Sequence, residues 1–327
     1  MTSSQTQATA RFTGVAMILL TLAGWTSIPL FLRHFKDQID PWTANGWRYG
    51  ISALIWLPPL FIGAARGSLP KGLWRAALVP SIFNTVAQVC FAIAPYMVEP
   101  GLMTFSMRLQ IVFLMGGAAF FFPAERRVIR SMGFIVGMSM VLMGTMATLY
   151  FKPGGLGGGT LAGVLISITA GILYAGYSLS VRHYMHGMNS LMAFAAVSQY
   201  TAGAIVVLML VLGERAGMKA LDMPGREFAY LVLSAIVGIG VGHTLYFASI
   251  ARLGLAVSAG VVQMQPITVS VGSYFLFGEI LTTDQWVGGV AAIAGAAIML
   301  IAQHRAKSAH EVKQTNVALA EMEAAND

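Results

Sequence analysis

Two arginines lie inside apolar stretches of the sequence, where a charge is costly. Arg108 lies seven residues after Gly101, and Arg48 lies six residues after Trp42. A guanidinium keeps its charge at ordinary pH, and its planar fork of donors suits a carboxylate or phosphate. Both residues are therefore candidates for binding an anionic solute. The alternative is structural, because either side chain could bond helix-end carbonyls or Glu99, or extend to the surface. We favour anion binding for Arg108 and a structural role for Arg48.

Four amide side chains lie in the same kind of apolar stretch. Asn84 and Gln88 are four residues apart, so they share one face of a helix. Gln263 and Gln265 lie near the middle of another stretch, next to Pro266, which weakens a helix ladder. These amides could line a cavity and bind a polar solute, or they could hydrogen-bond neighbouring helices together.

Aromatic and imidazole side chains give a third group of candidates. Trp25 and Tyr174 lie near the middle of their stretches, where they could stack on a ligand and donate a hydrogen bond, or pack as ordinary core. His243 is the only histidine deep in such a stretch. It could carry a proton or serve a structural role. Because every Asp and Glu lies at or beyond the end of a stretch, a carboxylate proton relay is not favoured.

The sequence lacks the motifs of other function classes. No GxxxxGK[ST], HExxH or GxSxG occurs, and no pore loop is evident, so an ATP motor, an intramembrane enzyme and a channel are all less favoured. We expect no cofactor and no metal. The net charge of +7 comes from residues scattered in short connections, which indicates membrane topology rather than nucleic-acid binding.

The elements that position these residues are membrane-spanning helices. With 57% hydrophobic and 10% charged residues and a mean hydropathy of +0.71, the chain is an integral membrane protein, all-α in fold class. Stretches of about 20 apolar residues match the thickness of a bilayer. Ten such spans are predicted, at 13–33, 42–62, 73–96, 101–122, 128–150, 160–182, 190–212, 228–249, 255–277 and 284–303.

The distribution of Lys and Arg predicts the orientation. With a cytoplasmic N-terminus, inside segments carry 12 of the 20 basic residues and outside segments carry 6, and Arg48 and Arg108 stay in the membrane. Both termini are therefore expected in the cytoplasm. The tails at 1–12 and 304–327 are polar; the second is expected to be disordered or loosely helical.

The chain divides into two halves of similar design. Five-helix repeats are predicted at 13–150 and 160–303, joined by a Gly-rich linker at 151–159. Glu125 and Glu279 end corresponding stretches 154 residues apart. Because five is odd, the second repeat must enter the membrane inverted relative to the first. Inverted repeats are typical of secondary transporters that work by alternating access.

The segment from His243 to Leu300 resembles the second repeat of the drug/metabolite transporter superfamily, EamA type. It has a small-residue helix start after Leu255, the mid-helix Pro266 and a turn from Gly278. Arg48 and Glu125 resemble family positions of the first repeat, but Val112 stands where a second proline would match. The resemblance implies a ten-helix inner-membrane exporter or exchanger of small metabolites.

Together these observations predict a secondary-active transporter, a monomer or homodimer in the lipid bilayer. Its expected partners are small-molecule substrates that bear a carboxylate, amino acids foremost. The alternative is multidrug efflux of cationic compounds, because 20 Met residues could provide an adaptable binding surface. The candidate substrate-binding residues are Trp25, Arg48, Asn84, Gln88, Arg108, Tyr174, His243, Gln263 and Gln265.

Overall fold

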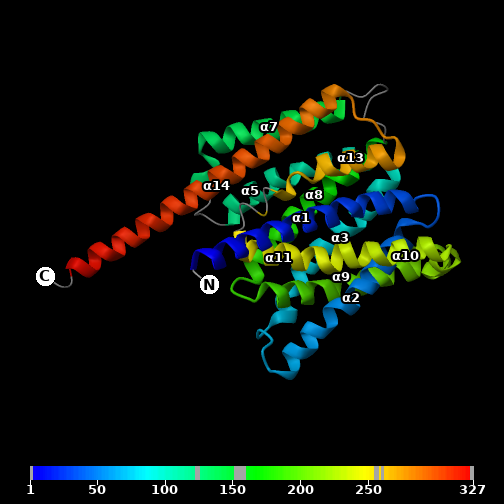
Figure 1. Ribbon diagram of the computed structural model, residues 1–327, viewed down its shortest axis with the longest axis horizontal. Coiled ribbons are helices and arrows are strands. Elements are labelled where there is room, and N and C mark those ends of the chain that lie inside the picture. The colour runs from blue at the N-terminus through cyan, green and yellow to red at the C-terminus, as the bar shows by residue number, and fades with distance from the viewer. Residues whose placement is uncertain (1–2, 122–125, 151–159, 254–257, 259–260, 325–327) are drawn as a thin grey trace.

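The computed structural model describes residues 3–121, 126–150, 160–253, 258 and 261–324, and every element in these ranges is a helix (Figure 1). Glu125, the linker at 151–159 and most of 254–260 lie outside the described residues. Within this part of the chain, eight helices are long and apolar enough to cross a membrane. They are Phe12–Phe35, Pro41–Ala65, Leu73–Met97, Pro100–Phe121, Leu161–Tyr184, Ser190–Leu212, Gly225–Ile250 and Thr283–Ala302.

The elements follow one another in two sets. The first half contains α1 (Ser3–Phe35), α2 (Pro41–Ala65), α3 (Leu73–Met97), α4 (Pro100–Ser106), η1 (Met107–Leu109), α5 (Gln110–Phe121), α6 (Arg126–Ile129) and α7 (Met132–Tyr150). The second half contains α8 (Leu161–Tyr184), α9 (Ser190–Leu212), η4 (Glu214–Asp222), α10 (Gly225–Ser234), η5 (Ala235–Val241), α11 (Gly242–Leu253), α13 (Gln265–Phe277) and α14 (Thr283–Ala324).

Two of the ten predicted spans have shorter helices. The fifth corresponds to α7, whose apolar part is Met132–Thr148, and the ninth contains α13, a helix of 13 residues. Pro266, expected in mid-helix, instead lies in the first turn of α13, where its missing N–H costs no ladder bond. The number of ten spans therefore stays a prediction. Both tails are largely helical, since α1 begins at Ser3 and α14 continues to Ala324.

Polar side chains cap the first turns of α2 and α9. Asp40 caps α2 by accepting a hydrogen bond from the Thr43 backbone N–H at 2.9 Å. Asn189 does the same for α9, with the Leu191 and Met192 amides at 3.0 and 3.2 Å. These caps satisfy backbone N–H donors that the helix itself leaves without acceptors. An unsatisfied donor is costly where water is scarce. Between the helix ends, the backbone N–H and C=O groups of each apolar segment hydrogen-bond to one another within the helix.

The two halves pack against each other along their whole length. Helix α1 packs against α11 and α13 of the second half, while α8 packs against α3 and α5 of the first. Helix α2 lies on α9, α4 lies on α13, and α7 lies on α14. Figure 1 shows α7 and α14 side by side at one edge, with α14 extending beyond the bundle. The core therefore consists mainly of contacts between the halves.

Three helical spans are irregular inside the bundle. The fourth tightens to a 3₁₀ turn at Met107–Leu109 between α4 and α5. The ninth is interrupted by a turn at 263–264, just before α13. The eighth contains the π-helical segment η5 between α10 and α11. Such interruptions release main-chain groups and often mark functional sites in membrane proteins.

Candidate functional site

The Arg108 side chain lies where the interruptions of the fourth and ninth spans meet. Its Nη1 donates to Gln263 Oε1 at 2.6 Å, and its Nη2 is 3.5 Å from Gln265 Oε1. Its Nε donates to the Thr104 carbonyl at 3.3 Å. Among the described residues, no carboxylate lies within ion-pair distance of this guanidinium. Neutral oxygens therefore hold a half-buried charge that they do not neutralise.

Helix α1 completes this group from the other side. Gln265 Nε2 donates to the main-chain carbonyl of Trp25 at 2.9 Å. One residue further along α1, the hydroxyls of Thr26 and Thr268 are 2.5 Å apart. Two interrupted spans and the middle of α1 thus share one polar centre, which we call the Arg108 centre and define as Arg108, Gln263, Gln265 and the Trp25 carbonyl.

The Trp25 ring connects the Arg108 centre to a group of aromatic side chains. Its centroid is 5.1 Å from that of His243 and 5.0 Å from that of Tyr246, both on α11. Phe194 of α9 stacks on His243, with centroids 4.3 Å apart. The Trp25 Nε1 atom is buried and has no hydrogen-bond partner among the described residues. This unpaired donor lies beside Gly242 at the start of α11, where a Cβ would come within 2.7 Å of it.

His243 is held as a structural histidine would be. Its Nδ1 donates to the Ile239 carbonyl one turn earlier, at 3.2 Å, and the ring lies between Phe194 and Trp25. Among the described residues, no acid lies beside it to exchange a proton.

We therefore expect that His243→Gln leaves the dependence of transport on an imposed pH gradient unchanged, because the ring has no acidic partner in a relay. The measurement is solute uptake into proteoliposomes with and without the gradient. His183→Gln, an exposed position at the end of α8, is the matched control. A parent driven by the gradient and a His243→Gln protein that loses this drive would contradict the expectation.

The amides of the third span lie elsewhere. Asn84 Nδ2 donates to the Thr201 hydroxyl of α9 at 3.0 Å, which makes it a link between helices. Gln88 contributes its main-chain carbonyl, which accepts from Asn45 Nδ2 at 3.2 Å. The structure therefore does not bring Asn84 into contact with the Arg108 centre. The hydrogen bond of Asn84 to Thr201 corresponds to the expectation that these amides join neighbouring helices.

Arg48 and Tyr174 form a separate group. Arg48 is only 1% exposed, and its Nε and Nη1 atoms have no hydrogen-bond partner among the described residues. Tyr174 of α8 lies close enough to interact with it electrostatically, and its ring meets Phe91 edge-on with centroids 6.3 Å apart. Arg48 therefore shares with Arg108 a charge without an acidic partner, but the two have different neighbours.

Ion pairs between the halves lie at the end of the bundle away from both termini (Figure 1). Arg33 of α1 is 2.7 Å from Glu279, which follows α13 and also accepts a hydrogen bond from Ser273. His34 is 2.6 Å from Glu227 of α10. These two contacts, the far-end ion pairs, tie α1 to two helices of the second half.

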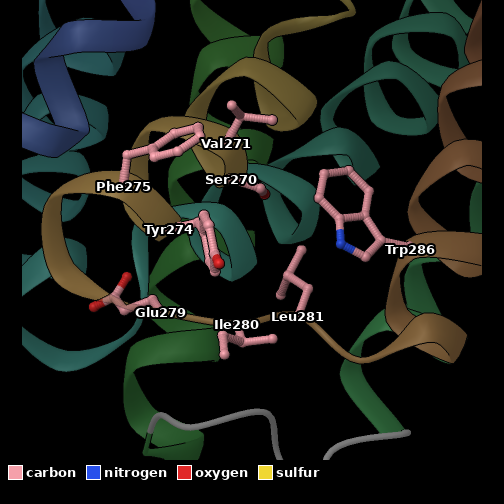
Figure 2. A pocket seen from close by; sticks show the side chains of 8 residues that line it. All are labelled: Ser270, Val271, Tyr274, Phe275, Glu279, Ile280, Leu281 and Trp286. Atoms are coloured by element: carbon pink, nitrogen blue, oxygen red, sulfur yellow. The ribbon is translucent and has the colours of Figure 1, made fainter.

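A small cavity of about 300 Å³ lies near the same end, between α13 and α14. Figure 2 shows that the Glu279 carboxylate points away from Trp286 on the opposite wall. Because Glu279 is already engaged by Arg33, the cavity offers no unpaired charge, and we do not assign it to the solute. Its lining residues are Ser270, Val271, Tyr274, Phe275, Glu279, Ile280, Leu281 and Trp286.

Several participants could not be identified from the sequence. Phe194 and Tyr246 are ordinary aromatic residues of apolar stretches, and nothing in their spacing marks them as neighbours of His243. Thr26 and Thr268 are single hydroxyls of the kind that most spans contain. The charge of Glu279 at a helix end was visible, but its partner Arg33 was not, because the pairing requires knowing which helices are adjacent.

A bundle of apolar helices with guanidinium and amide groups at its interrupted spans defines a multi-span membrane protein with a polar centre. The model of the EamA-like transporter family matches residues 12–150 and 161–301. The chain therefore belongs to the EamA-like transporter family, and it is a membrane transporter of small solutes. This confirms the resemblance to the drug/metabolite transporter superfamily.

Comparisons with other proteins give the fold but no closer function. One solved structure, described as "Crystal structure of protein", is similar with a TM-score of 0.60 and 17% sequence identity. The match covers 91% of this chain and 98% of that chain. No curated protein matches.

Proposed function

We propose that this protein is a secondary-active transporter that binds the carboxylate of a small metabolite at Arg108. The observation that supports this most is a guanidinium inside the bundle, held by two amide oxygens and a carbonyl with no acid among its described neighbours. A carboxylate is a better partner than an amide for this fork, because it adds charge to the hydrogen bonds. Amino acids are the foremost candidates among such solutes.

Binding would replace weak contacts with strong ones. The 3.5 Å contact of Arg108 with Gln265 is at the limit of a hydrogen bond, so a carboxylate can displace it at little cost. The freed amides of Gln263 and Gln265 can then contact the rest of the solute. The unpaired Trp25 Nε1, on the α11 side of the same ring, is a further donor that a solute reaching beyond the Arg108 centre could use. Specificity would follow from these neutral groups and affinity from Arg108.

We further propose alternating access between two inverted repeats. If each span is exchanged for the one five places along, the observed pairs map onto one another: α1 on α11 becomes α8 on α3, and α1 on α13 becomes α8 on α5. The pairs α2 with α9, α4 with α13 and α7 with α14 map onto themselves. This pattern is what a pseudo-two-fold axis produces, and it supports a solute site where the fourth and ninth spans meet.

The orientation is part of the same proposal. The excess of Lys and Arg in the connections on the side of the termini supports a cytoplasmic location for both, in a bacterial inner membrane. The far-end ion pairs would then face the outside, so the structure corresponds to a state that is closed to the outside.

Counterflow into proteoliposomes tests the function. Vesicles loaded with one unlabelled solute should accumulate the same labelled solute transiently, with amino acids, organic acids, nucleosides and cationic dyes tested in turn. Saturable counterflow separates a carrier from an enzyme, which shows none, and from a channel, which does not saturate in this way. Counterflow of cationic dyes but of no carboxylate would favour the multidrug alternative.

Removing a far-end ion pair should open the outer end. Glu279→Gln leaves Arg33 without its charged partner, and a partly exposed ion pair contributes about 1 kcal/mol, which changes a conformational equilibrium about fivefold. Cys90, the only cysteine, lies seven residues before the far end of α3. We expect Glu279→Gln to speed modification of Cys90 by a membrane-impermeant maleimide added from outside.

Asp284→Asn is the matched control for this experiment, because it removes a carboxylate from the first turn of α14, just five residues after Glu279. Its rate should equal that of the parent. Equal rates for Glu279→Gln and Asp284→Asn would show that the Arg33–Glu279 pair does not hold the outer end closed.

A further inference from the structure

Arg48 is the largest fully buried side chain in the part of the chain that the structure describes. It is 1% exposed, and its Nε and Nη1 atoms find no hydrogen-bond acceptor among the described residues. None of the ion pairs in this part of the chain includes it. A guanidinium cannot lose its proton at ordinary pH, so the charge persists. A buried charge without a partner is strongly unfavourable, and a bound anion is one means of offsetting it.

The side chains around Arg48 are suited to an anion. Tyr49 of α2, Tyr174 of α8 and Tyr96 of α3 lie within electrostatic range of the guanidinium. The Tyr96 hydroxyl donates to the Ile39 carbonyl at 3.1 Å, whereas no hydrogen bond engages the Tyr174 hydroxyl among the described residues. That hydroxyl can donate to an anion held by Arg48. No carboxylate of the described chain competes for the same position.

The π-helical segment η5 also lies beside Arg48. A Cβ built at Gly238 would lie 3.7 Å from Arg48 Nη2 and 2.5 Å from a carbon of Ile28. The glycine therefore lets the backbone of η5 approach Ile28 of α1 closely, and it lies at ordinary contact distance from the guanidinium. Because π segments occur frequently at functional sites, their presence beside an unpaired charge is a second sign that this place binds something.

The surroundings of Arg48 are distinct from the Arg108 centre. Arg108 contacts Gln263 and Gln265 of the ninth span, while Arg48 lies near the tyrosines of α3 and α8 and near η5. Helix α1 contacts both, since the Trp25 carbonyl accepts from Gln265 and Ile28 packs on Gly238. Among the described residues, no hydrogen bond joins the two guanidiniums.

We propose that Arg48 and the Tyr174 hydroxyl form a second anion-binding site, which takes a small monovalent anion. The guanidinium fork suits a carboxylate, and the Tyr174 hydroxyl suits either a carboxylate or a chloride ion. The anion supplies the counter-charge that the chain itself does not. This goes beyond the solute site at Arg108 and does not depend on it.

The test is anion-dependent thermal stability of the purified protein in the Arg108→Gln background, which removes the anion site of the proposed function. Sodium acetate or sodium chloride replaces sodium HEPES at constant ionic strength. A ligand that binds the folded state raises the unfolding temperature along a saturating curve. We expect such a rise with at least one of the two anions, and the arm that saturates at lower concentration identifies the occupant.

Adding Arg48→Gln should abolish the rise. Arg48→Lys keeps the charge but loses the fork, so saturation should require a higher anion concentration. If neither variant folds, Tyr174→Phe decides, because loss of the donor should also shift saturation to higher concentration. A flat curve in Arg108→Gln, a rise that persists in Arg48→Gln, or an unchanged curve in Tyr174→Phe overturns the proposal. Counterflow with Arg108→Gln judges the solute site separately.

Discussion

Replacing Arg108 by Gln should abolish counterflow of carboxylate-bearing solutes while the protein still folds and inserts. Removing one partner of a buried charge pair, here Arg108 opposite the solute carboxylate, costs about 3 kcal/mol of binding free energy, which lowers affinity about a hundredfold. The loss falls on binding because Arg108 is the charged group of its centre, whereas Gln263 and Gln265 are neutral. Glutamine keeps hydrogen-bonding capacity toward both amides, so the packing of the interrupted spans should survive.

Arg108→Lys separates charge from geometry. An ammonium keeps the charge but cannot bind a carboxylate through two parallel bonds, so these solutes should bind more weakly and still be carried. Arg252→Gln is the matched control, because it makes the same change at an exposed arginine whose Nη1 only caps the Ala248 carbonyl, at 2.9 Å. Its counterflow should equal that of the parent.

Two outcomes would contradict this prediction. If Arg108→Gln protein fails to insert or is degraded, Arg108 is a structural residue that links the fourth and ninth spans. If the variant folds and carries carboxylates at the parental rate, the solute does not bind there. Retained transport of cationic dyes in that variant would favour the multidrug alternative, for which Arg108 would be a repulsive group.

The sequence predicts the spans well because hydrocarbon thickness dictates their length. The span predicted at 13–33 is observed as Phe12–Phe35, and that predicted at 190–212 is observed as Ser190–Leu212. The interruption of the ninth span was signalled by Pro266, although the helix restarts there instead of continuing through it. The 3₁₀ turn at Met107–Leu109 had no such signal, since its residues are all compatible with a regular helix.

The candidate site was predictable only as a set of residue types at depth. Counting from the span ends placed Arg108, Gln263 and Gln265 inside the membrane, but their contact depends on which helices are neighbours. The same limit applies to Asn84, whose partner Thr201 lies 117 residues away and has no distinguishing pattern around it. The depth of a residue in the membrane follows from the sequence of its own span, whereas its side-chain partners depend on how all the spans pack together.

The packing of α7 against α14 leads to the second large effect. Cβ atoms built at Gly144 and Gly288 would lie 2.4 and 2.7 Å from the main-chain oxygen of the other glycine. About two helical turns further along the same interface, Cβ atoms built at Gly137 and Gly295 would lie 2.6 and 2.5 Å from the main-chain oxygen of the other glycine. Two helices can approach this closely only where both lack side chains, and such contacts drive helix association in lipid.

Hydrogen bonds at the end of this interface depend on the same distance. Gln285 is fully buried, and its Nε2 donates to the Thr148 carbonyl at 3.0 Å. The Thr148 hydroxyl is 3.3 Å from the Gln285 carbonyl. If the helices separate, these groups lose their partners in a place without water, which adds to the cost of lost packing.

We therefore expect Gly144→Ala to destabilise the protein by about 2 kcal/mol, the usual cost of overpacking, and Gly144→Val to prevent accumulation of folded protein. Gly203→Ala of α9 is the matched control, because a Cβ there meets no atom within 4 Å. That change should be neutral or stabilise by up to about 1 kcal/mol, since alanine favours the helix. Thermal unfolding in detergent measures both variants. Equal unfolding temperatures for Gly144→Ala and Gly203→Ala would mean that α7 and α14 can separate without cost, and that the stability of the bundle lies in its other helix pairs.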